Sequence, residues 1–564
     1  MVAVKAKDRK QAKREGGNLT PLFFCGLFGG KNALDILFRA CYNIPMYALK
    51  GDFGMKKRGV RLLCLWIATV GLFASCGQSA THSGAGSDEN GAHVLYTGSE
   101  TAVLQGGART SIPLNADVGN QNHLTMSLTT DVDLVGYIRY EATDGSGKTN
   151  EEKIFIEKGA TEFSTFLDAF RVGSKGAFEK RIRSIELQNV ETVTGKATVQ
   201  KIGVSDRAYD QTQTLFIQDE YLKIGARLGA GGALTHVEKL NANVVEYIDE
   251  KGVVRIESGV DKTAVKTVTD EVNLVNIYDW GREIQQSYYI AADKTHGYEP
   301  KEEQLWPYDG VLYNPVQAGS AGDKQSQIID YTISDTEIWV KTRPQEWFFD
   351  NTLSDSYMEN RYTLADGALL VSNRFINFSG FTGTEQLPLQ MQEMPAIYIA
   401  HPLDYFYCET IDGVIKDNHI GTMATKAKTR ATQLVEGQYH YALEGELVPG
   451  GWIAYVNDKD FGLGIYMPNA MVYLATRNGT PSSYDDEYSH KVHPIHDLSK
   501  YEYYPSTYVF NYGYLCPNVA MTITEYTPVE YGYAIYAGQV TEMRAYFNQI
   551  KKDGMIENKE FIKR

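Results

Sequence analysis

From His93 onward the chain repeats short segments in which apolar and polar residues alternate, with turn residues on either side. Alternation with a period of two buries one face of a β-strand and leaves the other face polar. The composition agrees, because 38 Tyr and 52 Gly among 564 residues favour strands and turns over helices. One helical pattern occurs near the C-terminus, where Met543, Tyr546, Phe547 and Ile550 recur at helical spacing. We therefore expect an all-β protein with a short C-terminal helix.

An export signal is predicted between Met55 and Cys76. Basic residues come first, the apolar run Leu62–Phe73 follows, and two small residues precede the cysteine. As a helix the run would rise only about 18 Å, too little to span a bilayer core comfortably. The ending resembles the bacterial lipoprotein box, in which the cysteine after two small residues is lipidated. This resemblance implies lipidation of Cys76.

The residues that follow this signal show no packing pattern. Residues 77–92 are rich in Gly, Ser and Ala, as flexible tethers are, and we expect residues 1–54 to be an upstream extension outside the mature protein. The sequence thus predicts an exported protein anchored to a membrane through Cys76 and facing the periplasm or the cell exterior. Cys408 and Cys516 would remain for a disulfide, which an oxidising compartment permits and sequence separation cannot establish.

The strand patterns form two groups. Residues 93–207 suit an antiparallel β-sandwich and resemble jelly rolls of the carbohydrate-binding type, a purely structural sandwich being the alternative. Residues 214–550 are longer, and their opening segments Tyr221–Gly225 and Gly231–Thr235 resemble the start of galactose-mutarotase-like supersandwich domains. That resemblance implies a large twisted sheet with a substrate cleft on its concave face, and a carbohydrate-active protein.

Charge and missing motifs exclude several classes of function. The net charge of −15, with no strongly basic segment beyond the first sixty or so residues, argues against a nucleic-acid partner. No Walker loop, zincin helix, nucleophile elbow or dinucleotide fingerprint occurs in a convincing context, which argues against kinases, proteases and redox enzymes. His490, His493 and His496 suggest a metal site, but Pro494 opposes a helix that would gather them. We expect no metal and no cofactor.

The densest polar segment is 273–289, where polar residues occupy both faces of an apparent strand. Amphipathic strands normally keep one face apolar, so one face here must meet solvent, a ligand or a polar network. Acids, amides and phenols on a rigid strand suit the hydroxyls and apolar faces of a sugar. A structural ion pair between Asp279 and Arg282 is the alternative. The predicted sugar contacts in this segment and the next loop are Arg282, Gln285, Gln286, Tyr288, Trp306, Tyr308, Tyr313, Asn314 and Gln317.

Three residues are candidates for catalysis. Glu393 lies among apolar residues, and burial would raise its pKa and suit it to general-acid catalysis. Asp279 is the candidate base or nucleophile that would complete the paired carboxylates of a glycosidase. His401, near the end of the apolar segment, titrates near neutral pH and is a candidate acid, base or hydrogen-bond donor. Each residue alone would also suit a structural role.

These patterns predict a lipid-anchored carbohydrate-active protein, with hydrolysis of an oligo- or polysaccharide as the preferred reaction. Non-catalytic glycan binding is one alternative, and sugar epimerisation or polysaccharide elimination is another. No motif transfers a catalytic residue of the mutarotase-like family to a position of this chain. The sequence leaves the sugar, the linkage and the oligomeric state open.

Overall fold

The computed structural model describes residues 93–99, 101–118, 121–142, 149–167, 180–208, 210–251, 254–277, 281–291, 313–320, 324–347, 352–381, 390–417, 439–478, 512–556 and 558. The predicted signal segment, Cys76 and the tether lie outside these residues. Within them, no helix is both long enough and apolar enough to cross a membrane.

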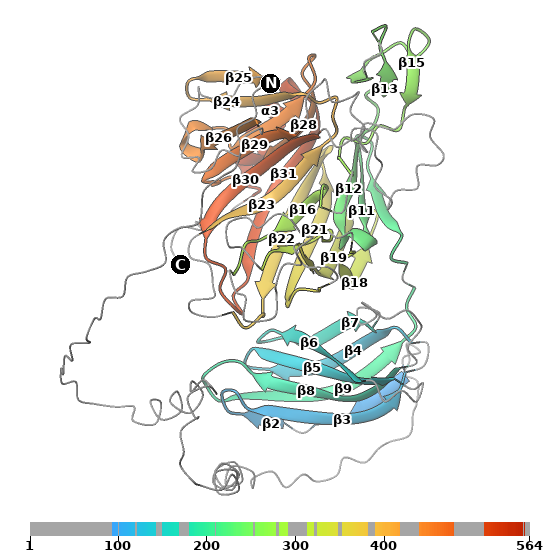
Figure 1. Ribbon diagram of the computed structural model, residues 1–564, viewed down its shortest axis with the longest axis vertical. Helices are drawn as coiled ribbons and strands as arrows, with labels where there is room; N and C mark the ends of the chain where they lie inside the picture. The colour runs from blue at the N-terminus through green and yellow to red at the C-terminus, as the bar shows by residue number, and fades with distance from the viewer. Residues whose placement is uncertain are drawn as a thin grey trace, which may run out of the picture. The chain divides into compact units, whose positions relative to one another are not determined.

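The first nine strands form two antiparallel sheets of their own (Figure 1). They are β1 (His93–Thr97), β2 (Thr101–Leu104), β3 (Arg109–Asp117), β4 (His123–Thr130), β5 (Leu134–Ala142), β6 (Thr149–Ile156), β7 (Glu162–Phe166), β8 (Lys180–Asn189) and β9 (Gly195–Ser205). One sheet has the order β1-β9-β4-β7, with β2 also paired to β9, and the other has the order β3-β8-β5-β6. Alternate residues of each strand fill the space between them, as Leu124, Met126 and Leu128 of β4 do. The result is the sandwich that the alternation predicts.

A second group of strands forms a larger ten-stranded sheet, in the order β10-β11-β12-β16-β23-β30-β29-β26, with β17 and β20 continuing from β16. Its members are β10 (Thr214–Gln218), β11 (Leu222–Arg227), β12 (Ala233–Lys239), β16 (Ile284–Ser287), β17 (Pro315–Val316), β20 (Gln345–Glu346), β23 (Gln390–Ile399), β26 (Tyr439–Glu444), β29 (Val472–Asn478) and β30 (Tyr512–Met521). Figure 1 shows β23, β30, β29 and β26 side by side.

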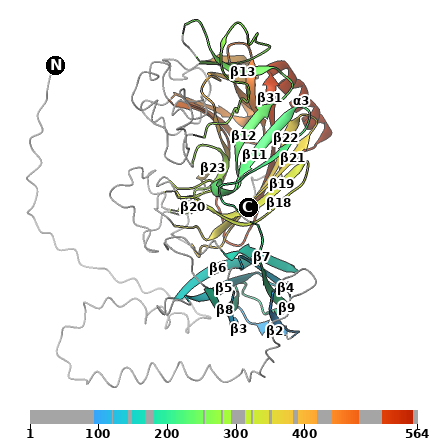
Figure 2. The ribbon, with the colours of Figure 1, turned by 90° about the vertical axis from the view of Figure 1, so that its right-hand side faces the viewer.

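A nine-stranded antiparallel sheet has the order β18-β19-β21-β22-β31-β28-β27-β24-β25. Its members are β18 (Gln327–Ile333), β19 (Glu337–Arg343), β21 (Ser356–Ala365), β22 (Ala368–Asn377), β24 (Tyr405–Thr410), β25 (Gly413–Asp417), β27 (Trp452–Val456), β28 (Phe461–Tyr466) and β31 (Val529–Gln539). In Figure 2, β19, β21 and β22 are seen next to one another. A small sheet of β13 (Val244–Ile248), β14 (Val254–Ser258) and β15 (Lys266–Thr269) accompanies the two large ones.

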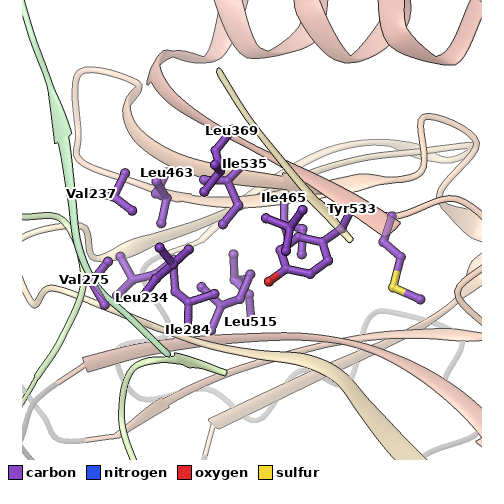
Figure 3. Close-up of a cluster of buried hydrophobic side chains, with 14 of the residues drawn as sticks. Leu234, Val237, Val275, Ile284, Leu369, Leu463, Ile465, Leu515, Tyr533 and Ile535 are labelled. Atoms are coloured by element: carbon purple, nitrogen blue, oxygen red, sulfur yellow. The ribbon is translucent and has the colours of Figure 1, made fainter. Parts of the chain in front are cut away.

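The core of this second sandwich lies between the two large sheets. Leu234 and Ile284 of the ten-stranded sheet point toward Leu463, Ile465 and Ile535 of the nine-stranded sheet (Figure 3), and all five are at most 1% exposed. Contacts of this kind exclude water from both inner faces and hold the sheets together. The all-β fold class is therefore confirmed.

The one described α-helix, α3 (Val540–Asp553), follows β31 directly. Gln539 and Glu542 form a reciprocal capping box at its start, and Gly554 ends it in a left-handed conformation. Met543, Phe547 and Ile550 are buried against the nine-stranded sheet. The expected C-terminal helix is thus present at the expected spacing.

The described residues belong to one compact unit, and buried contacts join strands of the two sandwiches. Phe155 packs in a cluster with Tyr357 and Phe378. The Arg343 guanidinium, 8% exposed, donates to the carboxylates of Glu152 and Asp355. Pairing on both sides compensates the cost of burying this cation.

Candidate functional site

Strand β23 lies near the middle of the ten-stranded sheet and has two different faces. Ile397 and Ile399 point inward and belong to the main core. Ala396 lies on the opposite face, in a separate small cluster with Tyr514 and Cys516 of β30 and with the partly buried Tyr398. We call this second face, which is turned away from the nine-stranded sheet, the outer face.

Glu393 is a partly exposed residue of the outer face, and its carboxyl group is buried among hydroxyl donors. Its Oε1 accepts hydrogen bonds from the Tyr289 hydroxyl at 3.0 Å and from the Tyr514 hydroxyl at 2.8 Å, and Ser287 also donates to it. Burial raises the pKa of Glu393 above its usual value, and the three hydroxyl donors act against that rise. The protonated form thus persists to higher pH than in an exposed glutamate, as the apolar neighbours in the sequence predict.

Gln392, the residue before Glu393, holds Tyr289 in place. Its Oε1 accepts from the Tyr289 backbone N–H at 2.8 Å, and its Nε2 donates to the Tyr289 carbonyl at 2.9 Å. Strand β16 ends at Ser287. Beyond it, the Gln392 side chain makes the two hydrogen bonds to Tyr289 that a neighbouring strand's backbone would otherwise make. It fixes the backbone from which the Tyr289 hydroxyl reaches Glu393.

The change Gln392→Met should lower the free energy of unfolding by about 1–3 kcal/mol, because it removes the hydrogen bonds that Gln392 makes to the Tyr289 N–H and carbonyl. Urea unfolding of the purified protein measures the change. Gln390→Met, at a partly exposed position of the same strand, is the matched control and should stay within about 0.5 kcal/mol. Equal stability losses in the two variants would contradict the role assigned to Gln392.

Arg282 joins aromatic rings beside this carboxyl. Its guanidinium carbon lies 5.8 Å from the ring centre of Trp347 and 6.0 Å from that of Tyr398. The Tyr398 and Tyr514 rings are 4.8 Å apart. A Cβ at Gly281 would lie 2.3 Å from the Trp347 ring, so only glycine permits this approach. The group presents ring faces, a guanidinium and phenol hydroxyls within one region.

The local path of the chain explains why Arg282 stands at this place. The Asn276 N–H donates to the Tyr398 carbonyl at 3.0 Å, and the Tyr398 N–H donates to the Glu283 carbonyl at 3.3 Å. Asn276 and Glu283 therefore bond to the same residue of β23, and this places Arg282 beside Tyr398. Asp279, the proposed base or nucleophile, lies outside the described residues.

Gln286 and Tyr288 take part in a buried ring of hydrogen bonds between the two large sheets. Gln286 Nε2 donates to Asn360 Oδ1 at 3.0 Å, and Asn360 Nδ2 donates to Asn373 Oδ1 at 2.7 Å. Asn373 Nδ2 then donates to the Tyr531 hydroxyl at 2.8 Å, and Tyr531 donates to the Tyr288 oxygen. Tyr288 closes the ring by donating to Gln286 Oε1 at 2.8 Å. All five donate in the same sense around the ring, which strengthens each bond by polarisation.

Four other predicted sugar contacts are also buried and bonded within the protein. Gln285 forms hydrogen bonds with Gly281 and Ala318, and Tyr313 forms them with Ser354 and Asp355. Asn314 is hydrogen-bonded to Tyr288, Ser287 and Glu346. Gln317 is hydrogen-bonded to Gln286, Gly231 and Asn360. The expectation that these side chains contact a sugar is thus corrected: like Gln286 and Tyr288, they are structural. Of the predicted contacts, Arg282 remains on the outer face, and Trp306 and Tyr308 lie outside the described residues.

His401 is separated from the Glu393 region. Glu393 pairs with Asn518, whereas Ile399, two residues before His401, pairs with Gly513, so about 17 Å of strand separates Glu393 from Ile399. The His401 side chain is buried, with Nδ1 3.6 Å from Asp404 Oδ1. His401 and Glu393 therefore cannot act on the same bond, and the sequence proximity of the two was misleading.

Other predicted features can be placed as follows. Cys408 and Cys516 are buried free thiols, so they form no disulfide. Among the residues with a described structure, no group of three or more His, Cys, Asp or Glu could hold a metal ion. The three histidines at 490, 493 and 496 fall outside that part of the chain. Tyr514 and Trp347 escaped the sequence reasoning, because nothing in their local pattern distinguishes them from core aromatics.

No protein-family model matches the chain, and no curated protein matches it. Several solved structures are similar over part of it. A putative aldose 1-epimerase from Escherichia coli matches 58% of this chain and 99% of its own at 10% identity and a TM-score of 0.29. A galactose mutarotase related enzyme from Lactobacillus acidophilus matches 58% and 98% at 10% identity and a TM-score of 0.30. A 4-alpha-glucanotransferase from Thermococcus litoralis matches 59% and 38% at 9% identity and a TM-score of 0.25. No conclusion about activity follows from similarities this distant.

Proposed function

We propose that the outer face of the ten-stranded sheet binds a carbohydrate and that Glu393 donates a proton during cleavage of a glycosidic bond. The observation that carries this proposal is a partly exposed glutamate whose carboxyl has a raised pKa and is held by Tyr289 and Tyr514 next to the Arg282 and aromatic group. The predicted export and the lipid anchor at Cys76 are part of the same proposal and rest on the sequence.

The chemistry follows from the protonation state. A neutral carboxylic acid can transfer its proton to the glycosidic oxygen as the bond between that oxygen and the anomeric carbon breaks. The carboxylate left on Glu393 is then stabilised by the hydroxyls of Tyr289 and Tyr514. Arg282 and the aromatic rings beside it suit the hydroxyls and the apolar face of the sugar. Asp279 stays the proposed base or nucleophile on the sequence argument: as base it takes a proton from the water that bonds to the anomeric carbon, and as nucleophile it bonds to that carbon first and is then displaced by water.

The test is to incubate the purified protein with a panel of plant, fungal and bacterial polysaccharides. Binding is measured by calorimetry, and products are measured by reducing-end assay, size analysis and ultraviolet absorbance. New reducing ends without ultraviolet absorbance would support hydrolysis. Unsaturated products would favour elimination, and binding without products would favour a non-catalytic glycan-binding protein. Absence of both binding and products across the panel would refute the proposal.

A further inference from the structure

Phe216 lies on the same outer face as Glu393, at the far edge of the ten-stranded sheet. Its neighbours Leu215 and Ile217 on β10 belong to the core between the sheets, so the alternation directs Phe216 outward. Likewise, His236 of β12 precedes the core residue Val237 and is itself partly exposed. The outer face thus extends from β23 to the edge strand β10.

The strand register aligns Phe216 with Tyr398, the ring that lies between Arg282 and Tyr514. Phe216 pairs with Gly225, and Gly225 pairs with His236, so these three residues lie in one line across β10, β11 and β12. The pairs Leu234↔Ile284 and Ile284↔Ile397 continue the register into β23. Leu234 and Ile397 both pair with Ile284, so they lie at the same height along the strands. His236, two residues after Leu234, is therefore within about one residue of the height of Tyr398, which pairs with Tyr514.

The Phe216 side chain is 48% exposed, an unusual position for a phenylalanine on a sheet. Its ring leans over Gly225, where a Cβ would lie 2.6 Å from Phe216 Cε1. The His236 ring stands edge-on at 5.5 Å and 83°, and Lys223 Nζ is 5.3 Å from the ring centre. The His236 ring and the Lys223 ammonium also contact one Glu238 carboxylate oxygen, His236 Nε2 at 3.0 Å and Lys223 Nζ at 3.3 Å.

This arrangement matches the surface of a pyranose ring. The apolar C–H face of a sugar packs on an exposed aromatic ring, and its hydroxyls need donors and acceptors at the rim. Lys223 and His236 offer donors and Glu238 offers an acceptor beside Phe216. If the Phe216 ring served only to cover Gly225, it would not need Lys223, His236 and Glu238 beside it.

We propose that Phe216, Lys223 and His236 form a second sugar subsite in line with Tyr398 beside the Glu393 site, so that the ligand is an oligo- or polysaccharide that crosses the strands. At the level of Tyr398, the chain near Asn276 lies between β12 and β23 and bonds to both. Together with β11 and β12 it makes four strand spacings between β10 and β23. The span is about 19 Å, which a single sugar unit cannot cover. The inference rests on the proposed function and specifies its substrate as a chain.

The experiment compares long and short ligands of the same sugar by calorimetry. The probes are cellohexaose, xylohexaose, maltohexaose and hexagalacturonate, each with its disaccharide. For the sugar that binds, the wild-type protein should prefer the hexamer, and Phe216→Ala should weaken hexamer binding about tenfold while leaving disaccharide binding unchanged. Gly225→Val should cause the same loss, because its side chain would displace the Phe216 ring.

The matched control is Tyr221→Ala, a change of an aromatic that is 46% exposed and lies outside the aligned row. It should bind the hexamer like the wild type, and all variants should keep the wild-type melting temperature. Equal hexamer binding by wild type and Phe216→Ala, or equal wild-type affinity for hexamer and disaccharide, would overturn the second subsite while the proposed function stands. Failure of the wild type to bind any of the probes or any polysaccharide of the panel would overturn both.

Discussion

Glu393→Gln is expected to lower the rate of glycan cleavage by about 10²–10⁴-fold, the usual contribution of a general acid. Glutamine has nearly the same size, and its carbonyl oxygen can still accept from Tyr289 and Tyr514, so glycan binding should stay within about twofold. The amide has no proton of suitable acidity to give to the leaving oxygen. Initial rates from reducing-end release, with affinity from calorimetry, separate the two effects.

The pH dependence gives this prediction a second readout. Glu393 must be protonated to act, and its pKa lies above the usual value of 4.5. Activity should therefore be present below the raised pKa and disappear as the pH rises through it. Tyr514→Phe removes a donor that lowers this pKa, so the alkaline limb should move to higher pH.

The control for Glu393 is Glu337→Gln, on the nine-stranded sheet, which should leave both rate and pH profile unchanged. Cleavage by Glu393→Gln at the wild-type rate would show that Glu393 is not the proton donor. An alkaline limb that does not move in Tyr514→Phe would show that the limb belongs to another group.

Asn373→Leu is expected to lower the free energy of unfolding by about 2–5 kcal/mol. The change opens the ring of hydrogen bonds and leaves the Asn360 amide donor without its acceptor inside the sandwich. Each buried polar group that loses its partner costs about 1–3 kcal/mol, and the loss of polarisation around the ring adds to this. Against a total stability of about 5–15 kcal/mol this is a large effect, measurable by urea unfolding.

Ser372→Ala is the control for the ring, because Ser372 is exposed on the same strand and its change should stay within about 0.5 kcal/mol. The folded fraction of Asn373→Leu should cleave glycan at the wild-type rate, since the ring does not touch the outer face. An unchanged unfolding midpoint would contradict the structural role of the ring. An intact fold with lost cleavage would return Gln286 and Tyr288 to the list of sugar contacts.

The sequence and the structure agree where the evidence is local. The two-residue alternation predicts strands and their inner faces, as in Leu124, Met126 and Leu128, and the spacing of Met543, Phe547 and Ile550 predicts the helix. Apolar neighbours on both sides of Glu393 predict its raised pKa. All three inferences depend only on residues a few positions apart.

The polar segment 273–289 shows where such reasoning stops. Polar residues on both faces of a strand are consistent with a ligand site and equally with an internal network. Gln286 and Tyr288 belong to the network because Asn360, Asn373 and Tyr531, from three remote strands, face them across the sandwich. Ser287 and Tyr289 point the other way, toward Glu393.

By itself, the sequence determined that this chain forms strands, which residues of most strands face a core, and that Glu393 stands in apolar surroundings. Only the tertiary structure decided that Tyr289 and Tyr514 meet at Glu393, that His401 lies beyond Ile399, itself about 17 Å from Glu393 along β23, and that Phe216 lines up with Tyr398. The physical reason is that alternation is a property of neighbouring residues, whereas strand order and register are set by which distant faces exclude water together.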